Sequence, residues 1–455
     1  MNDATAVTAG VAATATLAAW VAGDDPASTS DRARTWAKHT LLDWLAVTIA
    51  GSREPLVDML AEEYPARADG ACALVGRGGA VGPIEAALIN GSAGHALDFD
   101  DVSSRTVGHP TAPIAPAALA LGQLTGASGE QLLRALVVGF EAQAFLGESL
   151  GAAHYQLGFH TTGTIGTFGA AAAAASLLRL DAARTRTAFG LAATEAAGLK
   201  CNFGTMAKPL HAGRAAANGL LAARLAARGF TAHDSALECA QGFARTQVPG
   251  AVAWRDGIDT SRGFAIESAL FKYHASCYLT HPTIEAVRTL REQHGLALDA
   301  LDAMTIHVAG NHRGVCDIDE PRTGLNVKFS IRHLAALALD GADTADLALY
   351  DEATAQDPRL GQARRRVSLQ VGAPGSVGPH AARVVLRTRD GRTLEATADV
   401  GEPWSDLDAQ WSRLVAKGRA IAAPVIGADR YERLVTAIHT LERAPSLNPL
   451  IEAIR

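Results

Sequence analysis

Ionisable side chains gather near residue 100 of a chain that is otherwise rich in alanine, leucine and glycine. The stretch GHALDFDDVSSRTVGHPTAPIAP runs from Gly94 to Pro116. Its ionisable residues are His95, Asp98, Asp100, Asp101, Arg105 and His109. Such a stretch is either a solvated loop or the lining of a site. Imidazole and carboxylate groups held side by side can move protons near neutral pH.

Four further polar clusters interrupt the apolar sequence. They are HYQLGFHTTGTIG with His160, LKCNFGTMAKPLHAG with Lys208, FKYHASCYLTHP with Lys272, and PRTGLNVKFSIRH with His333. Each has a structural explanation, because a single histidine in a helical protein is usually structural and an aspartate such as Asp98 can cap a helix or a turn. Together the clusters indicate one shared site, although the residues alone leave both interpretations open.

Several kinds of chemistry lack their signatures. HExxH is absent, and the six-residue spacing of His154 and His160 suits neither a helical metal-binding pair nor a zinc finger. No nucleophile elbow is present, Cys277 has no catalytic signature around it, and no phosphate-binding loop occurs. We therefore expect no metal and no cofactor. Histidine, lysine and aspartate remain as groups that could remove a proton next to a carboxylate and stabilise the charge that develops.

Composition narrows the possible partners. The 455 residues are 48% hydrophobic and 19% charged, with a net charge of −6 and no basic run, so a nucleic acid is not expected. The five cysteines are widely spaced without CxxC, which favours a reduced, cytoplasmic compartment. The N-terminus lacks the basic start of a secretory signal, and the Ala- and Gly-rich stretches are too weakly apolar for a membrane span.

The elements that must position these residues are mostly helices. Apolar residues at three- to four-residue spacing predict helices from about residue 5 to 240, including one over 31–51 that ends at Gly51. A capping box at Ser128 predicts another helix, Asp181 is a predicted N-cap, and a helix is predicted from Gly213 to Gly229. Lys208 and Pro209 then either belong to the site or form a loop before that helix.

The pattern changes to β-type near residue 265. LDAMTIHVAG, RRRVSLQVGA and ARVVLRTRDGRTLEATADV predict strands, and Asp390-Gly391 predicts a tight hairpin. Helical patterns resume after residue 400. The sequence therefore predicts a mainly α fold with an α+β insert. A large all-helical domain covers 1–265 and 400–455, and a smaller α+β lid domain covers 266–399.

The order of these motifs resembles the MmgE/PrpD family over nearly the whole chain. The matching stretches are HALDFDD, the following GHP, GFHTTGTIGTFGAAAAAA, KCNFGTMAKPLHAG, KYHASCYLTHP and KFSIRHLAALALDG. This family includes 2-methylcitrate dehydratase, cis-aconitate decarboxylase and iminodisuccinate epimerase. The resemblance implies a large helical domain with a smaller α+β lid, a homodimer, and action on small polycarboxylates without a metal or organic cofactor.

The resemblance also implies site residues. The family's active-site groups fall on the catalytic candidates Asp98, His109, His160 and Lys208. Lys272 and His333 are the candidates for substrate binding. We expect His109 and Lys208 on opposite sides of the substrate carbon, one as base and the other as acid. Asp98 would orient or balance a cation, and His160 would hold a carboxylate or share in proton transfer.

Departures from the family pattern bear on the reaction. Val102 stands where decarboxylase-like members have threonine, and His333 stands where they have tyrosine. Only seven residues separate Asp101 from His109, without the tryptophan-containing insert of dehydratase-like members. These features favour the iminodisuccinate epimerase branch. A lyase, either a 2-methylcitrate-type dehydratase or a cis-aconitate-type decarboxylase, is the alternative. A polycarboxylate-binding protein without catalysis is less favoured, and a scaffold less still.

Overall fold

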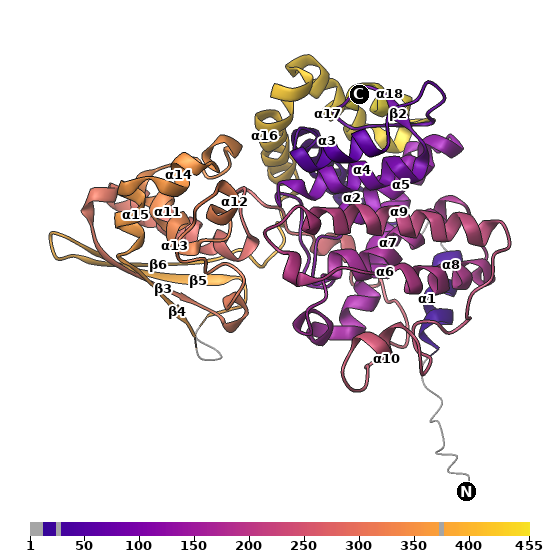
Figure 1. Ribbon diagram of the computed structural model, residues 1–455, viewed down its shortest axis with the longest axis horizontal. Helices are drawn as coiled ribbons and strands as arrows, with labels where there is room; N and C mark the ends of the chain where they lie inside the picture. The colour runs from indigo at the N-terminus through magenta and orange to yellow at the C-terminus, as the bar shows by residue number, and fades with distance from the viewer. Residues whose placement is uncertain (1–11, 24–28, 373–376) are drawn as a thin grey trace, which may run out of the picture. The chain divides into compact units, whose positions relative to one another are not determined.

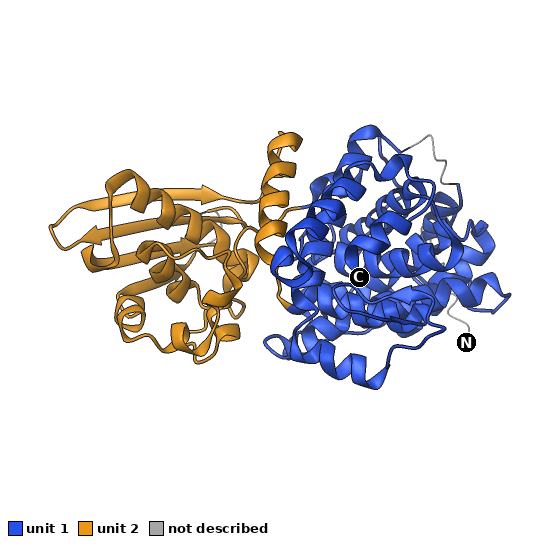
Figure 2. Ribbon diagram, turned by 90° about the horizontal axis from the view of Figure 1, so that it is seen from above, with its two compact units in different colours: residues 1–96, 100–269, 422–455 blue, residues 97–99, 270–421 orange. Residues whose placement is uncertain are grey.

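The computed structural model describes residues 12–23, 29–372 and 377–455 (Figure 1). The chain start, where the absence of a secretory signal was predicted, lies outside the described residues. Two compact units make up the chain (Figure 2). Unit 1 comprises Met1–Ala96, Asp100–Ala269 and Ala422–Arg455, and unit 2 comprises Leu97–Phe99 and Leu270–Ile421. The predicted domain boundaries lie after residues 265 and 399, whereas the boundaries between the two units lie after residues 269 and 421.

Unit 1 is almost entirely helical, which confirms the predicted class for this part of the chain. Its helices are α1 (Ala13–Ala22), α2 (Asp31–Gly51), α3 (Pro55–Glu63), α4 (Pro83–Ala96), α5 (Thr111–Thr125), α6 (Gly129–Gln156), α7 (Thr161–Leu177), α8 (Ala182–Glu195), α9 (Ala207–Ala227), α10 (Phe243–Gln247), α17 (Ala428–His439) and α18 (Asn448–Ile454). The strands β1 (Cys72–Ala73) and β2 (Ala80–Val81) form a short antiparallel hairpin. None of the described helices has both the length and the apolar character needed to cross a bilayer.

Local signals in the sequence set several helix ends. The side chain of Ser128 accepts a hydrogen bond from the Gln131 N–H and Gln131 returns one, so the predicted capping box starts α6. Asp181 caps α8 through the N–H of Arg184, as predicted. The predicted start of α9 at Gly213 is wrong by six residues, because α9 begins at Ala207. A proline in the first turn breaks no helical hydrogen bond, so Pro209 does not delay the helix.

Small residues let the central helices of unit 1 approach closely. A Cβ atom added to Gly213 of α9 would lie 2.2 Å from both the Leu88 carbonyl oxygen and the Ser92 Oγ of α4. A Cβ atom added to Gly219 would lie 2.5 Å from the Thr167 carbonyl oxygen of α7. The backbones of α4, α7 and α9 are therefore fixed against one another. The same three helices carry much of the site described below.

Replacing Gly213 by alanine tests this contact. Gly213→Ala is expected to lower the free energy of unfolding by about 2 kcal/mol, because the obstructing atoms are mostly backbone and cannot rotate away. Gly361→Ala in α15 (Pro358–Arg364) is the control, since its added Cβ meets only Arg365 Nη1 at 3.7 Å. Urea unfolding of both variants measures the difference. Equal stabilities for the two variants would contradict the close approach.

Unit 2 consists of a β-sheet and a layer of helices, in agreement with the predicted α+β class of the insert. Its sheet has the order β4-β3-β5-β6, with β3 parallel to β4 and antiparallel to β5. The strands are β3 (Leu301–Val308), β4 (Val367–Val371), β5 (Ala381–Thr388) and β6 (Thr393–Asp399). Helices cover one face of the sheet in Figure 1. They are α11 (His281–His294), α12 (Gly324–Val327), α13 (Ile331–Asp340), α14 (Glu352–Gln356) and α15.

Two connections in unit 2 matter for the predictions. The turn between β5 and β6 contains Asp390 and Gly391, with Gly391 at a φ of 89°, so the predicted hairpin is confirmed. After β6 the chain forms α16 (Leu407–Ile426), within which unit 2 ends and unit 1 resumes. The helical pattern after residue 400 was thus recognised, but one helix belongs to both units.

Candidate active site

Asp100 lies between two imidazole rings in unit 1. His95, at the end of α4, places its Nδ1 atom 3.0 Å from each carboxylate oxygen of Asp100. The Nδ1 atom of His109 lies 3.1 Å from Oδ2 of the same carboxylate. The side chains of His95 and Asp100 are fully buried, whereas that of His109 is 12% exposed. One carboxylate therefore orients two histidines, of which His109 is the more accessible.

The protonation states follow from burial and charge. Burial alone would raise the pKa of Asp100, but His109 and His95 outweigh it and hold this pKa well below the usual range. Burial lowers the pKa of His95 to about 4, with a partial offset from Asp100. At neutral pH an ionised Asp100 thus accepts the Nδ1–H of a neutral His95. This tautomer leaves the Nε2 lone pair of His95 unprotonated, which is the form a general base needs.

The nitrogen that this tautomer leaves unprotonated has no partner. Among the described residues, Nε2 of His95 makes no hydrogen bond, although it is buried. The His95 ring contacts the edge of His109, with ring centres 4.5 Å apart. A buried polar atom without a hydrogen bond is costly. Together with the hydrogen bond to Asp100 and the contact with His109, this makes His95 a functional candidate that was not selected from the sequence.

A closed loop presents His109. The N–H of Ser103 donates to the Gly108 carbonyl oxygen at 3.0 Å, which closes the loop that follows Asp101. The N–H of His109 donates to Thr162 Oγ1 at 3.1 Å, at the start of α7. A side chain at Gly108 would crowd the Oγ1 atoms of Thr161 and Thr162, each 3.0 Å from an added Cβ. The small residue before His109 thus lets this loop lie directly against α7.

His160 adds a third ring and His211 a fourth. His160 precedes α7 and stacks on His95, with ring centres 5.7 Å apart. Its Nδ1 atom lies 3.1 Å from Nδ1 of His211 on α9, so one of the two nitrogens donates to the other. Burial, followed by the charges of neighbouring groups, lowers the pKa of His160 well below its usual value. We call His95, His109, His160 and His211 the imidazole cluster.

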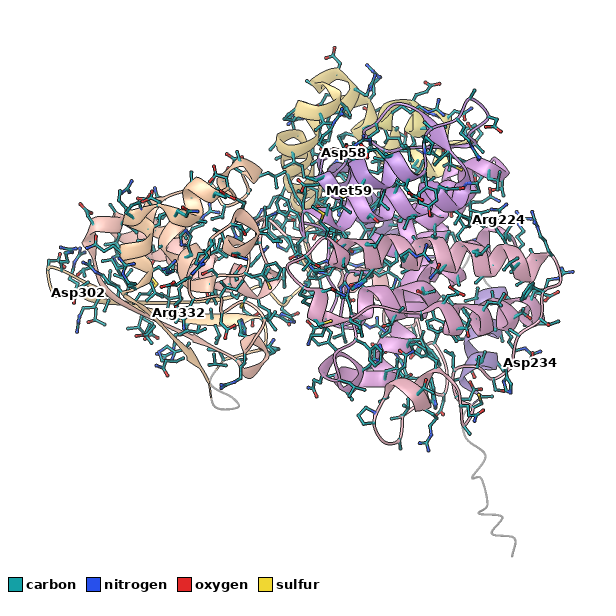
Figure 3. The ribbon with its side chains drawn as sticks, viewed as in Figure 1. Asp58, Met59, Arg224, Asp234, Asp302 and Arg332 are labelled. Carbon is teal, nitrogen blue, oxygen red and sulfur yellow. The ribbon has the colours of Figure 1, made fainter. Side chains whose placement is uncertain are left out.

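Lys208 supplies the positive charge nearest to this cluster. It lies in the first turn of α9, is 6% exposed, and places its Nζ atom 5.3 Å from the ring centre of Phe203. Its charge contributes to the lowered pKa values of His95 and His160, after burial. Lys208 and His211 are three residues apart and so share one helix face. In Figure 3, Arg224 marks the opposite half of α9, so the site occupies the N-terminal end of this helix.

Asp101 differs from its neighbour Asp100. Burial, and then the charge of Asp100, raises the pKa of Asp101 well above its usual value. Its Oδ2 atom accepts a hydrogen bond from Thr111 Oγ1 at 2.8 Å, at the first residue of α5. This shift favours the neutral form of Asp101, and its hydrogen bond with Thr111 fixes the start of α5. The pKa values of the two adjacent carboxyl groups are thus shifted in opposite directions.

Asp98 and Lys272 are brought together in unit 2. The Nζ atom of Lys272 lies 3.2 Å from Asp98 Oδ1 and donates to the Asp98 carbonyl oxygen at 2.6 Å. Asp98 has a φ of 52°, in the left-handed region that few residues other than glycine adopt. Along the chain, Asp98 and Asp100 are only two residues apart, yet they belong to different units.

His333 has different neighbours in unit 2. It is buried on α13, and its Nε2 atom lies 3.1 Å from the Thr354 carbonyl oxygen. Burial lowers its pKa to about 4. The adjacent Arg332, labelled in Figure 3, forms an ion pair with Asp319 at 3.2 Å. One ring nitrogen of His333 is thus hydrogen-bonded to Thr354, which belongs to the same helical layer.

The structure therefore groups the predicted residues in two sets. His109, His160 and Lys208 share the imidazole cluster, and Asp98 and Lys272 form an ion pair. His95, Asp100 and His211 also belong to the first set, but the sequence analysis treated them only as members of polar stretches. The sequence signal that could have identified them is their closeness to predicted residues. His95 and Asp100 flank Asp98, and His211 lies one helical turn after Lys208.

The donor atoms also raise the question of a metal. Ligand atoms of His95, Asp100 and His109 all lie within 4.8 Å of one another, and zinc accepts imidazole and carboxylate ligands. However, the Nδ1 atoms of both rings face the carboxylate of Asp100 at 3.0–3.1 Å. The His95 contact is a hydrogen bond and the His109 contact an ion-pair distance, so the donor atoms of both rings already face the carboxylate.

Family models identify the class of enzyme to which this chain belongs. The family model of the MmgE/PrpD N-terminal domain matches residues 15–253, and that of the MmgE/PrpD C-terminal domain matches residues 274–443. The chain belongs to the MmgE/PrpD family, as its motifs predicted, and is one of its enzymes.

Particular relatives give a finer comparison. Cis-aconitate decarboxylase of Aspergillus terreus (strain NIH 2624 / FGSC A1156) is 26% identical over 454 residues, covering 92% of this chain and 91% of its own. Cis-aconitate decarboxylase-like protein oryM of Aspergillus oryzae is 27% identical, covering 97% of both chains. Cis-aconitate decarboxylase of Mus musculus is 27% identical over 379 residues, covering 79% of this chain and 76% of its own. These names do not confirm the predicted epimerase branch.

Proposed function

We propose that this enzyme transfers a proton at a carbon next to a carboxylate of a small polycarboxylate, by acid–base catalysis without a cofactor, and that the net reaction is decarboxylation of an unsaturated tricarboxylate. The observation that carries the proposal is Asp100 held between His95 and His109. This arrangement fixes the tautomer of His95 and places the His109 ring beside the same carboxylate, with one lysine near the two rings. The names of the relatives favour a lyase over the other outcomes.

The proposed steps use only groups of this chain. As the bond between carbon and the departing carboxylate breaks, its electron pair forms a new double bond with the adjacent carbon, and the electrons of the original double bond move to the carbon beside a remaining carboxylate. Lys208 stabilises the negative charge that develops there. His109, in its protonated form, donates the proton that the carbon accepts, and Asp100 stabilises that imidazolium. The products are carbon dioxide and a dicarboxylate, and one proton is taken from the medium at each turnover.

Epimerisation is the second candidate, and particular residues favour it. Val102 and His333 depart from the decarboxylase pattern, and the seven-residue spacing before His109 matches the epimerase branch. In this reaction one of His109 and Lys208 removes the α proton and the other returns a proton to the opposite face. Both reactions need the same stabilisation of a carbanion, so the imidazole cluster alone favours neither.

A proton-exchange assay in deuterium oxide separates these outcomes. The enzyme, treated beforehand with a chelator, is incubated with cis-aconitate, 2-methylcitrate or iminodisuccinate and followed by NMR. The proposal expects carbon dioxide from cis-aconitate and one deuterium on carbon in the product. Deuterium at the α carbon of iminodisuccinate without loss of carbon dioxide or water would instead assign the epimerase. Absence of exchange with a full panel of di- and tricarboxylates would contradict the proposal.

His109→Gln is the matched variant for this assay. It should abolish product formation, because glutamine has no nitrogen that can donate a titratable proton. His233→Gln is the control, since His233 is an exposed imidazole outside the cluster. Ligand-induced thermal stabilisation of both variants shows whether the site still binds. Full activity of the His109 variant would remove this residue from the mechanism.

A further inference from the structure

Three lysines converge on three consecutive carbonyl groups in unit 2. The chain contributes only Leu97–Phe99 to this unit before residue 270. The Nζ donors pair with their carbonyl acceptors as follows: Lys328 with Leu97 at 2.8 Å, Lys272 with Asp98 at 2.6 Å, and Lys417 with Phe99 at 2.8 Å. We call these three side chains the lysine clamp. Its centre is Asp98, the residue with positive φ.

The clamp is built from separate parts of unit 2. Lys272 precedes α11, Lys328 follows α12, and Lys417 lies on α16. The three residues are 1%, 7% and 9% exposed, respectively. Long charged side chains are rarely buried unless hydrogen bonds or ion pairs compensate the loss of water. Such burial at three positions around one tripeptide indicates that this tripeptide must be held in place.

Lysine usage in the whole chain supports a specific role. The sequence contains 35 arginines but only six lysines, and half of those lysines form the clamp. An ammonium group is a compact point charge, whereas guanidinium is a wide planar fork. Nζ of Lys417 also lies 4.0 Å from the ring centre of Phe99, a position that leaves little room for the larger group. The contacts of Lys417 thus suit the compact ammonium group.

The backbone of Asp98 explains what the clamp holds. A residue other than glycine in the left-handed region is strained and stays there only where its surroundings fix it. Lys272 contacts both the side chain and the carbonyl group of Asp98, and the other two lysines fix the carbonyl groups on either side. Lys272 therefore contacts the Asp98 carboxylate directly, whereas Lys328 and Lys417 hold the backbone on either side of it.

We propose that Lys328 and Lys417 are positioning residues, which act with Lys272 to hold the Asp98 carboxylate in its working orientation. The catalytic part of this inference rests on the proposed function. Neither Lys328 nor Lys417 needs to touch the substrate for this role. Their removal should leave substrate binding largely intact and slow the chemical step.

Kinetics of methionine variants test the proposal. Lys328→Met and Lys417→Met should each lower kcat by about 10- to 100-fold while KM changes by less than about 3-fold, because displacement of a catalytic group mainly affects the transition state. Lys38→Met is the matched control, since Lys38 also donates to a carbonyl oxygen, that of His439, at 2.9 Å in unit 1. Values of kcat within about twofold of the control would overturn the proposal.

A double-mutant cycle tests whether the effect passes through Asp98. In the Asp98→Asn background, Lys417→Met should cost much less than it does in the wild-type background, because the carboxylate it positions is gone. Full additivity of the two changes would overturn the proposal. If a methionine variant does not fold, the glutamine variant, which keeps an N–H donor on a shorter side chain, is measured in the same way.

Hydrogen exchange gives a readout that does not depend on the substrate. Peptides covering residues 94–101 should exchange at least about tenfold faster in the Lys328 and Lys417 variants, because the carbonyl contacts that stabilise this segment are lost. The Lys38 variant should exchange like the wild type. Unchanged exchange in all variants would overturn the clamp. Faster exchange in an enzyme that converts no polycarboxylate would support the clamp while the proposed function fails.

Discussion

Replacing Asp100 by asparagine is expected to lower kcat by about 10³- to 10⁴-fold, with little loss of stability. Asparagine has the size of aspartate but presents one oxygen and one NH₂ group. It can accept the Nδ1–H of only one ring, so the other ring must turn its lone pair towards the amide. In addition, the protonated His109 that donates the proton to carbon loses the negative charge that stabilises it. Steady-state kinetics with a polycarboxylate substrate measures the loss.

Asp101→Asn is the matched control for this prediction. The pKa of Asp101 is raised well above its usual value, chiefly by burial, so its neutral form already resembles an amide. The acceptor for Thr111 Oγ1 is retained in asparagine, and kcat should stay close to the wild-type value. Two neighbouring and equally buried carboxyl groups are thus predicted to respond differently to the same substitution. Similar losses in both variants would contradict the assigned charge states.

Replacing Lys208 by methionine is expected to have the second large effect on catalysis. We expect kcat/KM to fall by about 10²-fold, because one preorganised positive group for the developing carboxylate charge is removed. The pH profile should change as well. Burial is the main cause of the lowered pKa values of His95 and His160, and the charge of Lys208 lowers both further. Without that charge the imidazoles gain protons at higher pH, so the acidic limb of the profile should move to higher pH.

Lys200→Met provides the comparison. Lys200 lies eight residues earlier in the same polar stretch, and its Nζ atom sits over the Tyr155 ring at 3.7 Å. Its charge is not among those that shift the pKa values of His95 or His160. This variant should keep both the rate and the pH profile. An unshifted acidic limb in the Lys208 variant would show that neither His95 nor His160 governs that limb.

The fold could be predicted where local chemistry determines it. The capping side chains of Ser128 and Asp181 and the turn at Asp390-Gly391 act over a few residues, so the sequence contains the whole signal. The start of α9 was placed too late because Lys208-Pro209 resembles a loop, although proline fits the first turn of a helix. The helix that belongs to both units could not be foreseen, because its division depends on contacts distant in sequence.

Some residues of the candidate site were selected from the sequence, whereas others are recognised only through contacts between residues distant in sequence. The resemblance to the MmgE/PrpD family selected His109, His160 and Lys208, which the structure brings together in unit 1. It did not select His95 or Asp100, because the roles proposed for them rest on the tautomer that their hydrogen bond imposes. That property depends on the geometry at the end of α4 and is not visible in residue spacing. The roles of Asp98, Lys272 and His333 stay predictions until variants are measured.

The brief passage of the chain through unit 2 has a consequence for synthesis. Leu97–Phe99 leave the ribosome early, whereas the Lys417 that binds the Phe99 carbonyl oxygen follows 318 residues later. At translation rates of about 5–20 residues per second, this delay is on the order of tens of seconds. The Phe99 carbonyl oxygen of the nascent chain therefore lacks its lysine partner until Lys417 has been synthesised, after the partners of Asp98 and Leu97. Chaperones that bind unfinished chains would have their longest opportunity during this interval.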